Sequence, residues 1–219
     1  MTPRKPTRRL STRGRYDRAQ SGKARRLAQR EALLDAATSV IARRGFAHTS
    51  VEAIVTRARM SRRTFYEHFK DLRDVLHQIH DRAADLGYAL ISAQLSAEPD
   101  PLEQIRIGIH TYLGAIASNP DVARVVFREV RAAGPEFEPR RERERERYTQ
   151  LLLGSLQQAH RGGQLAQPPD ETIAFALAAG VEAMALRILA RKEEEHAPRT
   201  AEALVQLTYR AFGVRAGEH

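Results

Sequence analysis

The stretch from Thr49 to Lys70 constrains the fold of this chain more than any other. It reads TSVEAIVTRARMSRRTFYEHFK. In its first half, apolar residues recur at the i, i+3, i+4 and i+7 spacing of one helical face, and they are Val51, Ile54, Val55 and Ala58. In its second half, Phe65 and Phe69 lie four residues apart and share one face of a second helix. The pattern therefore predicts two short helices with a tight break between them.

Local residues mark where these two helices begin. Thr49 and Glu52 have the spacing of a capping box, which predicts a helix start at Thr49 or Ser50. Ser61 offers a hydroxyl to cap the second helix. The second helix leaves basic and aromatic side chains for its outer faces, namely Arg62, Arg63, Tyr66 and His68. This combination is typical of a helix-turn-helix DNA reader, and an ordinary solvated basic helix is the competing interpretation.

The flanking sequence favours the first interpretation. From Ala32 to Leu76 the chain closely resembles the N-terminal DNA-binding domain of the TetR (tetracycline-repressor-like) family. The matching features occur in order at fixed spacing: Arg44-Gly45-Phe46, Thr49-Ser50-Val51, Met60-Ser61, Thr64-Phe65-Tyr66-Glu67-His68-Phe69 and Leu76. This match covers about a fifth of the chain, and the rest is compatible with the family without carrying a signature of its own.

The resemblance implies a set of DNA-binding residues. Thr49 and Ser50 are similar to residues that bind the DNA backbone at a helix N-terminus. Arg62, Arg63 and Thr64 are implied to face base edges, while Tyr66 and His68 hold phosphates. The full set that we expect to contact DNA is Thr49, Ser50, Ser61, Arg62, Arg63, Thr64, Tyr66, His68 and Lys70.

Two positions depart from the family pattern. Arg59 stands where the turn usually has glycine, so a non-glycine residue is expected to adopt a left-handed conformation at a cost of about 1 kcal/mol. Leu72 stands where the family usually has a phosphate-binding lysine. Lys70 and Arg73 flank it and are candidates to take over that contact.

The positive charge of the chain is concentrated at one end. Of the net charge of +9, residues 1–26 hold ten Lys and Arg against one acidic residue, a net of 10 − 1 = +9. We expect residues 1–26 to form a disordered basic arm, with Arg13, Arg15 and Arg18 as unranked candidates for minor-groove contacts. A solubilising tail without DNA contacts is an equal alternative.

The remaining sequence predicts an all-α fold of about nine helices. A first helix spans 27–44 and ends at Gly45, which suits a left-handed stop. A long helix begins near Asp71 and runs to about Leu95, and later helices begin at Pro- and Asp-containing caps. We expect a helix-turn-helix DNA-binding domain over 27–72 and a helical effector-binding and dimerisation domain over 73–219.

The last two helices, within about 170–212, are expected to pair with a second copy of the chain. Residues 173–181 are apolar without interruption, and a helix that is apolar all round must be buried or lie in lipid. Glu182 and Arg187 interrupt the run and argue against a membrane span. Two such helices from each of two chains would make a four-helix bundle, which is how the resembling family dimerises.

Candidates for an effector site are aromatic or polar residues of the helical body: Tyr88, His110, Tyr112, Phe127 and Glu129. His77 and His80 lie three apart, but the sequence fixes no third ligand, so we expect no metal site. The alternating Arg–Glu run at 140–147 is interpreted as a solvated face because its charges nearly cancel. The chain has no cysteine, which excludes disulfides, thiol catalysis and cysteine-based zinc sites.

These features predict a cytoplasmic, sequence-specific transcriptional regulator. The expected mechanism is a ligand-responsive repressor, a homodimer on palindromic double-stranded DNA with a small-molecule effector. The alternative is a DNA-binding adaptor or DNA-organising protein without an effector. No phosphate-binding glycine loop and no pairing of a nucleophile with a base is visible, so we expect neither an enzyme nor a bound cofactor.

Overall fold

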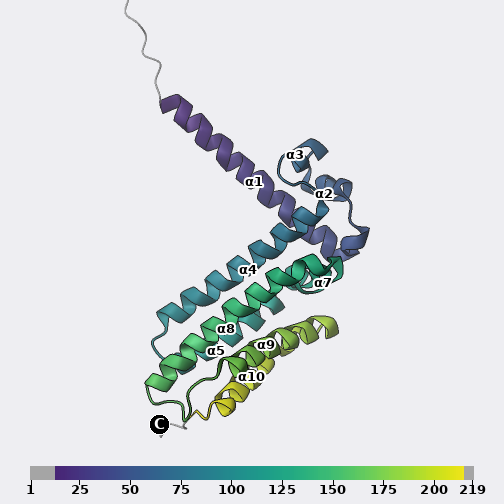
Figure 1. Ribbon diagram of the computed structural model, residues 1–219. Helices are drawn as coiled ribbons and strands as arrows, with labels where there is room; N and C mark the ends of the chain where they lie inside the picture. Colours follow the sequence, from purple (N-terminus) through teal and green to yellow (C-terminus); the bar gives the residue numbers. More distant parts are fainter. Residues whose placement is uncertain (1–12, 215–219) are drawn as a thin grey trace, which may run out of the picture.

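The computed structural model describes the backbone of residues 13–214 and the side chains of residues 22–214. Its helices are α1 (Arg13–Arg44), α2 (Val51–Ala58), α3 (Arg62–Tyr66), α4 (Leu72–Ala97), α5 (Pro101–Ser118), α6 (Pro120–Arg124), α7 (Val130–Ala133), α8 (Glu138–Arg161), α9 (Glu171–Arg191) and α10 (Ala197–Ala211). A π-helical segment, Val125–Glu129, joins α6 to α7, so these three segments form one continuous helix. Counted in this way, the described residues contain nine helices. The expected all-α fold is confirmed (Figure 1).

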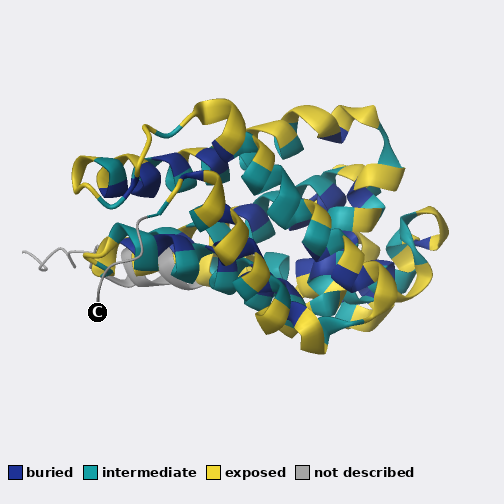
Figure 2. Ribbon diagram, turned by 90° about the horizontal axis from the view of Figure 1, so that it is seen from below, coloured by how far each residue is buried: buried dark blue, intermediate teal, exposed yellow. Residues whose placement is uncertain are grey.

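Two hydrophobic clusters divide this arrangement. The first lies among α1, α2, α3 and the start of α4, where it contains Leu33, Ile54 and Phe65, and it extends to Val125, Val130 and Phe137 of the segment between α6 and α8. The second lies among α5, α8, α9 and α10. We call the unit formed by α2, α3 and the adjoining end of α1 the α2–α3 head. Figure 1 shows α4 leading from this head into the bundle of α5, α8, α9 and α10. Figure 2 shows the buried residues gathered on the inward faces of the helices, which is the amphipathic pattern that the sequence spacing predicts.

The first helix is longer than expected. It begins at Arg13, whereas the sequence suggested a start at Leu27 after a disordered arm. The expectation of disorder therefore does not hold for residues 13–26, where the chain lacks proline and is rich in strong helix formers such as Arg, Ala, Gln and Lys. Residues 1–12 lie outside the described residues, as do the side chains of Arg13, Arg15 and Arg18.

Other boundaries follow the local signals closely. Helix α4 begins after Asp71, whose carboxylate accepts from the backbone N–H of Asp74 at 2.8 Å. Helix α3 ends at Tyr66, earlier than the expected Phe69, because the chain turns at residues 67 and 68. The Phe69 N–H still donates to the Phe65 carbonyl at 2.9 Å, so the two phenylalanines keep the spacing of one helical face.

Helix α9 is apolar but largely uncovered. By length and composition it is the one helix among the described residues that could cross a membrane. Only 22% of its most apolar window is buried against the rest of the chain. Ile173 on α9 and Leu207 on α10 are among the exposed large apolar residues. Within one chain, an apolar face on α9 and α10 therefore remains exposed to solvent.

Candidate functional site

The α2–α3 unit is built by two serine caps and a strained turn. The Ser50 Oγ accepts from the Ala53 N–H at 3.2 Å, and the Ser61 Oγ accepts from the Thr64 N–H at 3.0 Å. Between the helices, Arg59 has φ 55° and ψ 43°, which confirms the expected left-handed conformation. The predicted capping box is not formed, because Ser50 caps α2 in place of Thr49.

Helix α3 is anchored by one face and exposed on the other. Phe65 and Phe69 are 0% and 2% exposed, and their ring centroids lie 5.4 Å apart. On the opposite face Arg63 and Tyr66 project into solvent, and the Arg63 side chain is 90% exposed. Glu67 holds Arg63 through a hydrogen bond of 3.2 Å from Nε, so this acidic residue positions a basic one. A rigid inner face with a basic, aromatic outer face fits a DNA groove.

The remaining expected DNA contacts differ in availability. Ser50, Ser61, Arg62 and Lys70 are exposed, and the Lys70 N–H is held by Asp74 at 2.9 Å. Thr49 is buried, and its hydroxyl donates to the Gly45 carbonyl at 2.8 Å. The Thr64 hydroxyl lies 2.9 Å from that of Ser61.

His68 is half-buried, and burial together with Arg26 lowers its pKa. A neutral His68 would contact a phosphate by a hydrogen bond and not by charge.

The position of the missing lysine is occupied by a packing residue. Leu72 packs against the hydrophobic cluster of the α2–α3 head. Arg73, one of its two proposed substitutes, donates to the Ala133 carbonyl at 3.1 Å and pairs with Glu136. Arg73 therefore links α4 to the C-terminal end of α7. Of the two flanking residues, Lys70 is the one whose side chain is free of such contacts with the described residues, and it is the candidate to contact phosphate.

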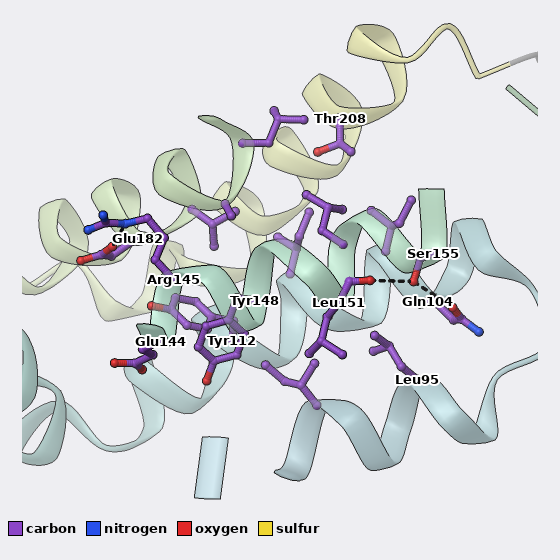
Figure 3. A pocket seen from close by; sticks show the side chains of 18 of the residues that line it. Leu95, Gln104, Tyr112, Glu144, Arg145, Tyr148, Leu151, Ser155, Glu182 and Thr208 are labelled. Atoms are coloured by element: carbon purple, nitrogen blue, oxygen red, sulfur yellow. Dashed lines mark hydrogen bonds and ion pairs between the residues drawn. The ribbon is translucent and has the colours of Figure 1, made fainter. Parts of the chain in front are cut away.

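A cavity of about 90 Å³ lies inside the helical body, between α4, α5, the π segment, α8, α9 and α10. One end is polar and holds His80, Tyr112, Glu144, Arg145, Tyr148 and Glu182, as Figure 3 shows for most of them. Its apolar lining residues include Ile91, Leu95, Ile105, Ile109, Leu151 and Leu152. At the far end the Ser155 hydroxyl donates to the Gln104 side-chain oxygen at 2.8 Å. The cavity is thus apolar along its length and polar at both ends.

Burial and charge keep the tyrosines of the polar end protonated. Burial raises the pKa of Tyr112 well above its ordinary value, and the Glu144 carboxylate raises it further. The same two causes raise the pKa of Tyr148. The two rings meet edge to face with centroids 5.2 Å apart, so this end presents neutral aromatic surfaces beside a carboxylate.

Of the five effector candidates, the structure places Tyr112 and Phe127 on the cavity wall. The other three have different surroundings. The Arg147 guanidinium lies over the Tyr88 ring at 4.0 Å. His110 Nε2 lies 3.5 Å from a Glu202 oxygen on α10. The Glu129 carboxylate accepts from the Phe46 N–H at 2.8 Å and so joins the body to the α2–α3 head.

Sequence reasoning missed several cavity residues. The run at 140–147 is not entirely a solvated face, because Arg141, Glu144 and Arg145 line the cavity with side chains 13%, 17% and 16% exposed. One available signal was spacing: Glu144 lies four residues before Tyr148, on the stripe that continues through the apolar residues of α8. His80 is 2% exposed and lines the same end.

His77 has a packing role. Its ring stacks on that of Phe137 at 4.1 Å. Burial lowers the pKa of His77, so the imidazole is disfavoured as a cation.

Comparison with known proteins follows the same division of the chain. The family profile described as "Bacterial regulatory proteins, tetR family" matches residues 33–79. The profile described as "Tetracyclin repressor-like, C-terminal domain" matches residues 98–186. Among individually curated proteins, none matches the sequence.

Solved structures share the fold over most of the chain. The fatty acid degradation regulator FadR from Bacillus halodurans has a TM-score of 0.77 at 20% identity, covering 85% of this chain and 97% of its own. FadR from Bacillus subtilis, solved in complex with stearoyl-CoA, has a TM-score of 0.73 at 18% identity, covering 81% and 96%. A TetR-like transcriptional regulator from Rhodococcus sp. RHA1 has a TM-score of 0.63 at 25% identity, covering 81% and 93%.

Proposed function

The chain belongs to the TetR family of bacterial regulatory proteins, and we propose that it is a ligand-responsive repressor that binds a palindromic operator as a homodimer. Because its DNA target lies in the cytoplasm, we place its action there. The observation that carries the ligand response is the shared use of α4. His80, Ile91 and Leu95 of α4 line the cavity, while Val75 and Leu76 of the same helix belong to the core of the α2–α3 head.

DNA reading is assigned to the exposed face of α3. Arg62, Arg63 and Thr64 are proposed to reach base edges, since arginine can bind guanine bidentately and a threonine methyl can touch a thymine methyl. Ser50, Ser61, Tyr66 and Lys70 are proposed to hold the DNA backbone. The buried phenylalanines of α3 fix its angle, and this rigidity makes base contacts specific.

Dimerisation is assigned to α9 and α10. The exposed apolar side chains on these helices favour a buried interface, because a large apolar surface left in water is unfavourable. Two copies of α3 would then sit about 34–36 Å apart, which is one turn of DNA. The distance between them would depend on how each α4 is inclined.

The size of the cavity supports a response to ligand. Its volume of about 90 Å³ is well below the roughly 300–1,000 Å³ typical of sites for drug-sized ligands. A larger ligand would bind only if the surrounding helices moved apart. Since α4 forms one wall, such a ligand would favour the dimers in which α4 and the attached heads have moved, and would shift the population by its differential affinity.

A selection experiment with an operator readout tests the proposal. Genomic DNA fragments retained by the purified protein at physiological salt would be sequenced, and the recovered site labelled for fluorescence anisotropy. Arg63→Ala is expected to weaken operator binding by about 1–3 kcal/mol and to relax base preference. Arg161→Ala, an exposed arginine at the far end of α8, serves as the matched control and should bind as the wild type does.

The same experiment separates the competing functions. Retention of all duplexes alike, with a steep salt dependence, would select a DNA-organising protein. Unchanged affinity and base preference in Arg63→Ala would refute the assignment of α3 as the reading helix.

A further inference from the structure

The polar end of the cavity contains a carboxylate that no guanidinium neutralises. Glu144 is 17% exposed, and in the described part of the chain its ion-pair partner is His80, with Nε2 3.3 Å from Glu144 Oε2. His80 is 2% exposed, and neither of its ring nitrogens makes a hydrogen bond of normal geometry. A partly buried carboxylate beside a buried imidazole without a hydrogen bond indicates a missing polar partner.

The neighbouring arginines are already committed elsewhere. Glu182 receives Arg131, Arg141 and Arg145 at 2.9, 3.4 and 3.1 Å. Arg141 and Arg145 also pair with acidic residues one turn earlier on α8, Glu138 and Glu142. Three arginines thus face three carboxylates in this group, 3 − 3 = 0. Glu144 is therefore the carboxylate of this end that has no guanidinium partner, and His80 is the one residue that pairs with it in the described part of the chain.

Aromatic rings surround the same end. Tyr112 stands edge to face with Tyr148 at 5.2 Å and with Phe127 at 6.5 Å, and all three rings line the cavity. Both tyrosines stay neutral phenols, so their faces carry the partial negative charge that attracts cations. Figure 3 shows Glu144 beside these two rings at one end, with Leu151 and Leu95 farther along the cavity.

We propose that this end binds the positively charged headgroup of an amphipathic organic amine or quaternary ammonium. Glu144 is its counter-ion, and the aromatic rings of Tyr112 and Tyr148 contact the cation. The apolar part of the ligand lies along the cavity toward Leu151 and Leu95. An anionic amphiphile would have to displace Glu182 from its arginines. The inference rests on the proposed function, because it names the ligand class of that same cavity.

Matched amphiphiles test the ligand class directly. Binding of decyltrimethylammonium, decanol and decanoate, which share a ten-carbon chain, would be measured by isothermal titration calorimetry on the full-length protein. The cation is expected to bind tightest of the three. Glu144→Gln keeps the shape and removes the charge, and it should weaken binding of the cation by about tenfold or more while leaving decanol unchanged.

Control variants separate the charge and the rings from general damage. Glu146→Gln, an exposed carboxylate on the same helix, should bind the cation as the wild type does. Tyr112→Phe keeps the ring and should retain most of the affinity, whereas Tyr112→Leu should lose it. Thermal melts of each variant confirm that it folds.

The outcomes distinguish this inference from the function beneath it. Tighter binding of decanoate or decanol, no binding of the cation, or an undiminished affinity in Glu144→Gln would each overturn the ligand class. If decanoate, and not the cation, released the protein from its operator, the ligand-responsive regulator would stand and the cationic ligand would fall. If the protein retained no specific DNA sequence, the proposed function would be refuted. Calorimetry would still show which class of amphiphile the cavity binds.

Discussion

The left-handed Arg59 in the turn between α2 and α3 gives the sharpest test of the local reasoning. Its φ of 55° places a Cβ in a conformation that costs an L-residue roughly 1–2 kcal/mol. Arg59→Gly would remove that cost. It would also increase the freedom of the unfolded chain, which offsets about 0.4–1 kcal/mol. The net expectation is a gain of about 0.5–1 kcal/mol in the free energy of unfolding.

The assay is thermal unfolding followed by circular dichroism at one fixed protein concentration, because the melting temperature of a dimer depends on concentration. For a chain of this size the gain corresponds to a rise of roughly 1–4 °C. Arg59→Ala is the control, since it removes the side chain but keeps the Cβ and therefore the strain. If Arg59→Gly melted at or below the wild type, or if Arg59→Ala gained as much, the strain argument would be refuted.

Three other predictions concern packing, pH and assembly. Phe65→Ala should cost about 3–5 kcal/mol in denaturant unfolding because its ring is fully buried, whereas Tyr66→Ala on the exposed face should change stability by less than about 0.5 kcal/mol. Burial lowers the pKa of His77 below 6.5, so the folded state binds fewer protons than the unfolded state. The free energy of unfolding should therefore fall as the pH drops from 6.5 toward the lowered pKa. His77→Phe should reduce that fall, which is measured by urea midpoints at each pH. Ile173→Glu should convert the dimer to a monomer in sedimentation experiments, while Leu86→Glu, at a more exposed leucine on α4, should leave it dimeric.

The helix-turn-helix could be predicted in detail because its determinants are local. The i, i+3, i+4 spacing of Ile54 and Val55, the serine before α3 and the break at Arg59 all act within one or two turns of helix. The errors there were also local in kind. Thr49 and Ser50 both offer a capping hydroxyl, and the choice of Ser50 was decided by the Gly45 carbonyl, which takes the Thr49 hydroxyl.

The interior of the helical body could not be predicted to the same degree. The charged run at 140–147 satisfies the rules for a solvated helix when read alone, since each charge has an opposite neighbour within a turn. The spacing of Glu144 and Tyr148 indicates an inward stripe, but the packing of α8 against α9 and α4 decides that Arg141 and Arg145 also line the cavity. Glu129 shows the same limit: it had the residue type of a ligand contact, but the fold brings it to the Phe46 N–H, 83 positions away in sequence.

The sequence by itself determined the all-α class, the α2–turn–α3 pattern with its Ser61 cap, and the face of α3 that looks outward, because these depend on spacing within a few residues. Only the tertiary structure decided that Glu182 would meet three arginines, that Arg73 would turn to Glu136, and that Glu144 would face a cavity without a guanidinium. The reason is that the charge and solvation of a long polar side chain depend on what the neighbouring helices bring to it. Those neighbours are fixed by packing across the whole bundle.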